Sequence, residues 1–164
     1  MQNAGGTFDF GSEVTVDAVS KFPLILEPRH ADFDPAAWAS GHAAALRECI
    51  HQHGAILIRR AGAGGPDQFV SFAESICPVL HTEYGDLGDD DLTDKTYSST
   101  PYPVELPINI HNESACNTRW PLLLFLYCHQ AALEGGASRL VDSRRVLSEL
   151  PADLRRRLAK TPLT

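Results

Sequence analysis

The clearest periodicity in the chain is helical and starts after Asp34. Asp is a favoured residue at a helix N-terminus, and Pro35 suits the first helical turn. Apolar side chains then recur every three to four residues until Gly54 ends the pattern; they are Trp38, Ala45, Leu46, Cys49 and Ile50. This spacing predicts an amphipathic helix over residues 35–53.

The segments around this helix have a different pattern. The run from Phe22 to Pro28 is short, apolar and bounded by prolines, which predicts an edge strand or an extended entry segment. Residues 55–60 begin with continuous apolar and β-branched residues, as expected of a buried strand. Pro66 then begins a second predicted helix. Its apolar face carries Phe69, Phe72, Ala73 and Ile76.

Composition places the chain among folded domains that do not bind polyanions. Its 164 residues are 43% hydrophobic and 21% charged, which suits one soluble domain. The 14 Lys and Arg against 21 Asp and Glu give a net charge of −7, whereas nucleic acids and anionic membranes require clustered positive charge. Small molecules or proteins are therefore the expected partners, with no nucleic acid and no membrane.

The sequence also favours a cytoplasmic location. Residues 1–10 lack the basic and apolar regions of a signal peptide. The longest apolar run, residues 122–128, is too short to span a bilayer, which takes about 20 residues. The four cysteines form no Cys-x-x-Cys pair, so we expect reduced thiols.

Two loops are expected between the second helix and residue 108. Residues 86–94 contain five aspartates that do not alternate as a calcium loop requires, so we expect a solvated acidic loop. Prolines interrupt residues 97–107, which indicates a surface or pocket-lining loop. Weaker pocket candidates there are Tyr97, Ser98 and Thr100.

The most informative polar residues follow directly. Residues 108–113 alternate in character, so a strand would place Asn109, His111 and Glu113 on one face. A His and a carboxylate two residues apart on a strand can bind one metal ion, and Fe(II) favours such mixed ligands with open positions. Taken alone, His-x-Glu fits a hydrogen-bonded surface pair better than a metal site.

The remaining sequence predicts a hairpin and two helices. Residues 122–128 fit a strand buried on both faces. Gly135 and Gly136 are typical of a hairpin turn, and residues 138–141 would form the return strand. Asp142 or Ser143 would cap a helix. Two short amphipathic segments, the second starting at Pro151, are marked by Val146, Leu147, Leu150, Leu154 and Leu158.

These motifs together resemble a known family. The string HNESACNTRWPLLLFLYCHQAALEGGASRLVDSRRVLSEL is similar to the core of the TauD/TfdA-like Fe(II)- and 2-oxoglutarate-dependent dioxygenases, most of all to the branch that acts in natural-product biosynthesis. The shared features are HxE, WP with an apolar strand, GGxS, and a D-x-R-x-V helix start. The resemblance covers the chain from Phe22 onward.

The resemblance implies an α+β fold with a double-stranded β-helix (jelly roll) core and flanking N-terminal helices. Only the first core strands would be encoded here, with the C-terminal part of the core missing. Residues 1–21 would be an N-terminal extension, and residues 22–164 the N-terminal portion of a TauD-like oxygenase domain.

The resemblance also assigns roles to residues. His111 and Glu113 would be the first two ligands of a two-His-one-carboxylate Fe(II) site and would thereby serve catalysis. Ser138 matches the hydroxyl that hydrogen-bonds 2-oxoglutarate, although an ordinary strand hydroxyl is the alternative. Asn109, on the predicted ligand face, would contact substrate or cosubstrate.

Two parts of the family's site have no match. The family's distal His is not matched by His129, the only histidine after Glu113, and no residue matches the Arg that pairs with 2-oxoglutarate. The arginines at 139, 144, 145 and 155–157 are expected on solvated faces. His30, His42, His51, His53 and His81 are expected to be structural or exposed.

Three functions therefore stay open. The chain would be the N-terminal portion of an oxygenase that hydroxylates an amino-acid-like or carrier-bound biosynthetic intermediate. Further sequence, a second chain or a homo-oligomer would complete its core and supply the remaining metal ligand. Alternatively, it is a non-catalytic binding module derived from such an oxygenase. The third candidate is a two-ligand metalloprotein of another type.

Overall fold

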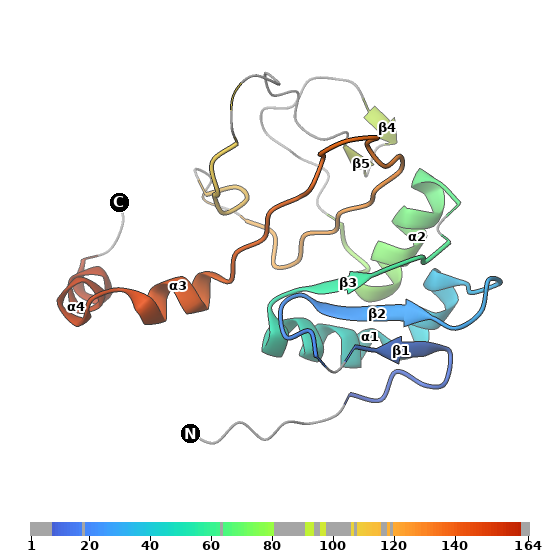
Figure 1. The fold of residues 1–164 in the computed structure, drawn as a ribbon, viewed down its shortest axis with the longest axis horizontal. Coiled ribbons are helices and arrows are strands. Elements are labelled where there is room, and N and C mark those ends of the chain that lie inside the picture. The colour runs from blue at the N-terminus through green and yellow to red at the C-terminus, as the bar shows by residue number, and fades with distance from the viewer. Residues whose placement is uncertain are drawn as a thin grey trace.

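The structure is a computed structural model (Figure 1). Its helices and strands up to residue 97 form the N-terminal body, and residues 120–161 form the C-terminal arm. The described residues are 8–17, 19–62, 64–80, 91–93, 96–97, 106, 108–115, 118 and 120–161. Among these, no helix is long and apolar enough to cross a membrane.

A small mixed sheet forms one layer of the body. Strands β1 (Val14–Val16), β2 (Leu24–Pro28) and β3 (Ile56–Ile58) lie in the order β1-β2-β3. The β1–β2 pair is antiparallel and the β2–β3 pair is parallel. Parallel neighbours need a crossover connection, and α1 (Pro35–His53) provides it. Figure 1 shows β1, β2 and β3 side by side, with α1 against them.

The predicted strand at residues 22–28 exists, but its predicted edge position is wrong. β2 is the central strand, with β1 and β3 on its two sides. Pro28 is the last residue of β2 and pairs with Val14. A proline at a strand end removes no hydrogen bond from the middle of the ladder, so it is compatible with a central strand.

The predicted first helix is confirmed, with both of its predicted ends. The Asp34 carboxylate accepts hydrogen bonds from the amides of Ala36 and Ala37, both at 3.0 Å. At the other end Gly54 adopts φ 85° and donates its amide to the carbonyl of Ile50. Such a left-handed residue ends a helix, and glycine adopts it without steric cost.

The core lies where α1 packs on the sheet and on α2 (Pro66–Ile76), the second predicted helix. The Arg47 guanidinium also donates to the carbonyl of Ile76 at 2.6 Å, which joins the two helices. The buried apolar side chains are Phe10, Val14, Leu24, Leu26, Trp38, Ala39, Leu46, Cys49, Ala73 and Ile76.

Residues before 22 take part in this core. Phe10 is buried, and its carbonyl accepts a hydrogen bond from the Trp38 indole at 3.1 Å. Val14 is also buried, within β1. The described part of the predicted N-terminal extension thus packs against α1 and β2, while the domain boundary at residue 22 stays a prediction.

Two expectations for strands and loops in the body need correction. The predicted buried strand at 55–60 is shorter, and Leu57 is 44% exposed because it points to the sheet face opposite Ile56 and Ile58, which pack against the core. Part of the predicted acidic loop is instead the strand β4 (Asp91–Thr93), which pairs with β5 (Thr96–Tyr97). Residues 86–90 and 94 lie outside the described residues.

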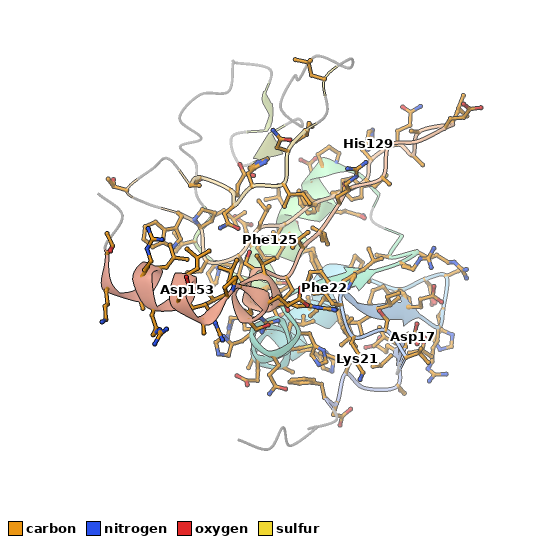
Figure 2. All side chains as sticks on the ribbon, turned by 60° about the vertical axis from the view of Figure 1, so that its left-hand side comes forward. Asp17, Lys21, Phe22, Phe125, His129 and Asp153 are labelled. Carbon is orange, nitrogen blue, oxygen red and sulfur yellow. The ribbon has the colours of Figure 1, made fainter. Side chains whose placement is uncertain are left out.

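Residues 122–128 are extended, but the prediction of a strand buried on both faces is wrong. Phe125 contacts Phe72 edge-on, with ring centroids 6.4 Å apart, and Tyr127 stacks on Phe69 at 5.3 Å. Figure 2 shows Phe125 over the body and His129 farther along this segment. The alternate residues face outward, since no second layer covers them among the described residues. They are Leu122, Leu124 and Leu126, with exposures of 94%, 55% and 67%.

The C-terminal arm keeps the predicted helices but not the predicted return strand. Gly135 and Gly136 adopt the positive φ values, 70° and 68°, that a tight hairpin turn needs, but no turn is assigned to them. Residues 138–141 are exposed, and no strand is assigned to them. The predicted helices are confirmed as α3 (Ser143–Glu149) and α4 (Ala152–Lys160).

The described part of the chain is therefore α+β, with one three-stranded sheet, one two-stranded sheet and four helices. A strand needs a hydrogen-bonded neighbour, and the extended segments after residue 107 have none among the described residues. The jelly roll implied by the family resemblance is not seen in these residues.

The core makes a direct stability test possible. Leu46→Ala removes a side chain that is 1% exposed, so we expect the free energy of unfolding to fall by about 2–5 kcal/mol. Urea denaturation measures this change. The matched control Leu133→Ala, at a fully exposed position of the arm, should change it by less than about 0.5 kcal/mol. Equal effects of the two variants would contradict this assignment of the core.

Candidate functional site

The predicted ligand segment is not a strand. Residues 108–112 are irregular and pair with no strand among the described residues, and a turn follows at residues 113–115. The Ala115 amide donates to the carbonyl of Asn112 at 3.3 Å, and Ser114 has a positive φ of 56°. The prediction of a strand at residues 108–113 is wrong, because its alternating pattern finds no neighbouring strand in the described chain.

His111 and Glu113 nevertheless converge. The distance from His111 Nε2 to Glu113 Oε2 is 3.7 Å. The two side chains are 59% and 28% exposed, so ions from solvent can reach them. The turn after Asn112 thus brings together the two side chains that a strand was expected to align.

The other ring nitrogen of His111 is also engaged. Nδ1 lies 2.8 Å from the carbonyl oxygen of Asn109. A carbonyl oxygen only accepts, so Nδ1 carries the hydrogen in this bond, and in the neutral ring Nε2 keeps its lone pair. A metal-binding histidine commonly has this arrangement, in which a backbone carbonyl fixes the ring orientation and tautomer.

The pair fits part of an iron site. Bonds from a first-row metal to nitrogen or oxygen are about 2.1 Å long, so one ion can contact two atoms that are 3.7 Å apart. One imidazole and one carboxylate are also two of the three ligands of a non-haem Fe(II) site. Among the described residues, no group of three His, Cys, Asp or Glu side chains could hold a metal ion.

The structure does not bring Ser138 or the Asn109 side chain to this pair. Ser138 is exposed, and within the described chain no hydrogen bond or ion pair joins it to His111 or Glu113. Asn109 contacts His111 through its main-chain carbonyl. Their roles toward 2-oxoglutarate and substrate stay predictions.

The remaining candidates do not add to the pair. His129 is exposed and its ring lies 6.0 Å from that of Tyr127. Cys49 is fully buried, and burial raises the pKa of its thiol to about 11, so it stays protonated and unreactive at neutral pH. The backbone of Tyr97 is described, but its side chain is not. Ser98, Thr100, His81 and Cys116 lie outside the described residues.

The interaction that sequence reasoning missed lies at the start of α3. Arg144 is exposed, as expected, and its guanidinium Nη1 also donates to the carbonyls of His51 and Gln52 at 2.9 and 3.0 Å. These carbonyls belong to the last turn of α1, where no helical amide reaches them. Arg144 thus joins α3 to the C-terminal end of α1, and Figure 1 shows the two helix ends near each other.

Asp142 orients this arginine. Its carboxylate receives Arg144 Nε at 2.9 Å and Nη2 at 3.0 Å, and it also caps α3 by accepting the Arg144 amide at 3.0 Å. The side-chain hydrogen bond from Arg144 lowers the pKa of Asp142, and the reciprocal bond raises the pKa of Arg144. The D-x-R spacing ahead of a helix was the signal in the sequence for this interaction, because it lets one carboxylate bind both the backbone amide and the guanidinium of the arginine.

A shallow open groove lies between α3 and α4. It has a volume of about 480 Å³ and contains none of the predicted ligands. Its lining combines two arginines with apolar side chains: Arg144, Leu147, Ser148, Arg155, Leu158 and Ala159. The groove is therefore a separate surface from the His111–Glu113 pair.

Comparison with known proteins identifies related sequences. Residues 19–163 match the family described as Taurine catabolism dioxygenase TauD, TfdA family. The chain is also similar to the dapdiamide synthesis protein DdaC of Enterobacter agglomerans, with 31% identity over 111 residues, 66% of this chain and 33% of DdaC. The chain thus spans about a third of the length of this curated relative. No solved structure matches it.

The Asp142–Arg144 pair predicts a pH-dependent contribution to stability. The folded pKa of Asp142 lies below its ordinary value of 3.8, so the contribution is present above that value and is lost as the pH falls through the folded pKa. Asp142→Asn should therefore lower the thermal unfolding midpoint at pH 7, and this effect should shrink progressively as the pH falls below 3.8.

The control for this prediction is Glu149→Gln. It removes the exposed ion pair with Arg145, whose Nε lies 2.9 Å from Glu149 Oε1. Differential scanning calorimetry across the pH range compares the variants. A difference between Asp142→Asn and the unmodified protein that is the same at pH 3 and pH 7 would contradict the assignment.

Proposed function

The chain belongs to the TauD/TfdA dioxygenase family, and on that premise we propose that it is part of an Fe(II)- and 2-oxoglutarate-dependent oxygenase of natural-product biosynthesis. The observation that carries the proposal is the convergence of His111 Nε2 and Glu113 Oε2 at 3.7 Å. The hydrogen bond from His111 Nδ1 to Asn109 leaves Nε2 free to bind a metal. The family match also agrees with the resemblance inferred from the HxE and GGxS motifs.

In this proposal the chain's residues hold and orient the reacting groups. His111 and Glu113 bind Fe(II) from one side, which leaves positions for other ligands. When bound, the iron and 2-oxoglutarate supply the activation of dioxygen for oxidation of the substrate. Ser138 hydrogen-bonds 2-oxoglutarate, and Asn109 contacts substrate or cosubstrate. Both residues are exposed here, so these roles require the arm and further protein to close over the pair.

We further propose that residues 22–164 are the N-terminal portion of the oxygenase domain, with a jelly-roll core completed by other protein. Leu122, Leu124 and Leu126 expose one side of an extended apolar segment. Such a face is costly in water and is suited to packing against a second layer. The relative DdaC is about three times as long as the matched segment, which is consistent with further core elements.

The substrate in this proposal is an amino-acid-like intermediate, either free or bound to a carrier protein. The named relative acts in dapdiamide synthesis, and the motifs resemble the biosynthetic branch of the family. Hydroxylation is the proposed outcome, because Glu113 supplies the carboxylate ligand of the proposed Fe(II) site. The net charge of −7 supports a small molecule or protein as the partner rather than a nucleic acid.

A non-catalytic binding module is the second candidate. Among the described residues no third metal ligand accompanies the pair, while the groove between α3 and α4 offers apolar and cationic contacts. Such a groove suits an amphipathic anion. This candidate predicts ligand binding that does not depend on His111.

The metal site is tested by anaerobic titration with Fe(II), and with Co(II) as a spectroscopic substitute. His111→Ala should weaken binding by at least about 100-fold, because changes that merely reorient a ligand cost about 10- to 100-fold. The control is His129→Ala, at an exposed histidine of the arm, which should leave the affinity unchanged. If the unmodified protein binds neither metal, or if His111→Ala binds as well as it does, the proposed iron site is wrong.

The incomplete core is tested by association. The 164-residue chain should sediment as a dimer or larger species, or bind a dye specific for exposed apolar surface, because its outward leucines lack a partner. The triple variant Leu122→Ser, Leu124→Ser, Leu126→Ser should remove most of both effects. A monomer that binds no dye would contradict the proposal that further protein covers this face.

A further inference from the structure

We propose that Arg144 is a positioning residue for the His111–Glu113 pair, because it holds the start of α3, and through it the ligand segment, on the C-terminal end of α1. The effect on metal affinity rests on the proposed function. The link from α1 to the ligand segment rests only on contacts between described residues.

The first step is the bond between the arm and the body. Arg144 donates from one nitrogen, Nη1, to the carbonyls of His51 and Gln52. Its other nitrogens, Nε and Nη2, bind the two carboxylate oxygens of Asp142. The planar guanidinium is thus bound along two edges, which determines its orientation. A lysine has no such planar set of donors.

The second step is the shape of the surface that receives Arg144. Gly54 ends α1 in the left-handed region, and a Cβ built there would lie 2.7 Å from Arg144 Nη2. Real Cβ contacts are longer, so a side chain at position 54 would strain the backbone and displace the guanidinium. The residue that ends α1 therefore also leaves room for the arginine.

The third step joins α3 to the ligand segment. The Ser143 hydroxyl donates to the Asn112 side-chain oxygen at 3.3 Å. Asn112 stands between His111 and Glu113, and its carbonyl accepts the hydrogen bond that closes the turn at Ala115. Within the described chain, no other hydrogen bond or ion pair connects residues 108–115 to the rest of the fold.

These steps place one continuous set of polar contacts between the buried helix α1 and the candidate ligands. Arg144 does not touch either ligand, so its effect acts through Ser143 and Asn112. Both predicted ligands are partly exposed, and neither belongs to the apolar core of the described residues. Their relative orientation therefore depends on this hydrogen bond more than it would in a buried site.

The chain offers a matched control in the neighbouring residue. Arg145 has the same charge and lies in the same helix, but its guanidinium binds Glu149 one turn later. It makes no bond to α1 within the described part of the chain. A comparison of Arg144→Gln with Arg145→Gln therefore isolates the contact from the loss of one positive charge.

The experiment measures Co(II) affinity and the Co(II) absorption spectrum under anaerobic conditions. We expect Arg144→Gln to weaken Co(II) binding by about five- to tenfold and Ser143→Ala by about threefold, while Arg145→Gln stays within about twofold of the unmodified protein. Ser143→Thr keeps the hydroxyl and should restore the affinity. A merely structural role of Ser143 would not be rescued in this way.

Amide hydrogen exchange provides a readout that needs no metal. Exchange at the Ala115 amide, which is hydrogen-bonded to the Asn112 carbonyl, should be faster in Arg144→Gln and in Gly54→Ala than in Arg145→Gln, because the turn loses its connection to α1. If no Co(II) binds the unmodified protein, the proposed function fails, but this comparison still decides the structural part.

Two results would overturn the inference. One is equal exchange at the Ala115 amide in Arg144→Gln and Arg145→Gln. The other is a Co(II) affinity that depends on His111 but is the same in Ser143→Ala and Ser143→Thr. If Arg144→Gln does not fold, the Ser143 pair and Gly54→Ala still decide between these outcomes.

Discussion

The burial of one face of α1 is the constraint on which the rest of the structure depends. Trp38, Leu46 and Cys49 lie on that face, and each is at most 3% exposed. Burying a large apolar side chain contributes about 1.5–3 kcal/mol, so this one helix holds both the sheet and α2. It also connects β2 to β3 as the crossover of the only parallel strand pair in the described chain.

The C-terminal end of the same helix receives the part of the chain that carries the candidate chemistry. Apolar contacts from Phe125 and Tyr127 to α2 hold the arm on one side, and Arg144 holds it on the other through the α1 carbonyls. The His111–Glu113 pair precedes these contacts along the sequence, and neither residue belongs to the core. Its geometry is therefore set by hydrogen bonds, which explains why it converges while remaining exposed.

Local signals in the sequence predicted the helix ends correctly, because the hydrogen bonds that form a helix end join residues only a few positions apart. Asp34 caps α1 through amides two and three residues away, and Gly54 ends it through the carbonyl of Ile50. The alternating patterns predicted poorly. Residues 108–113, 122–128 and 138–141 all suggested strands, but the hydrogen bonds that define a strand come from a neighbour elsewhere in the chain.

The sequence by itself determined the family, through its motifs, together with the helices and their ends and the proximity of His111 to Glu113. Only the tertiary structure decided that β2 is central, which side of residues 122–128 is buried, and that the exposed Arg144 binds the end of α1. The physical reason is one of distance along the chain. The hydrogen bonds of a cap or a turn join residues that are close in the sequence. By contrast, the residues that bury a side chain or bind the carbonyls at a helix end can lie about ninety positions away.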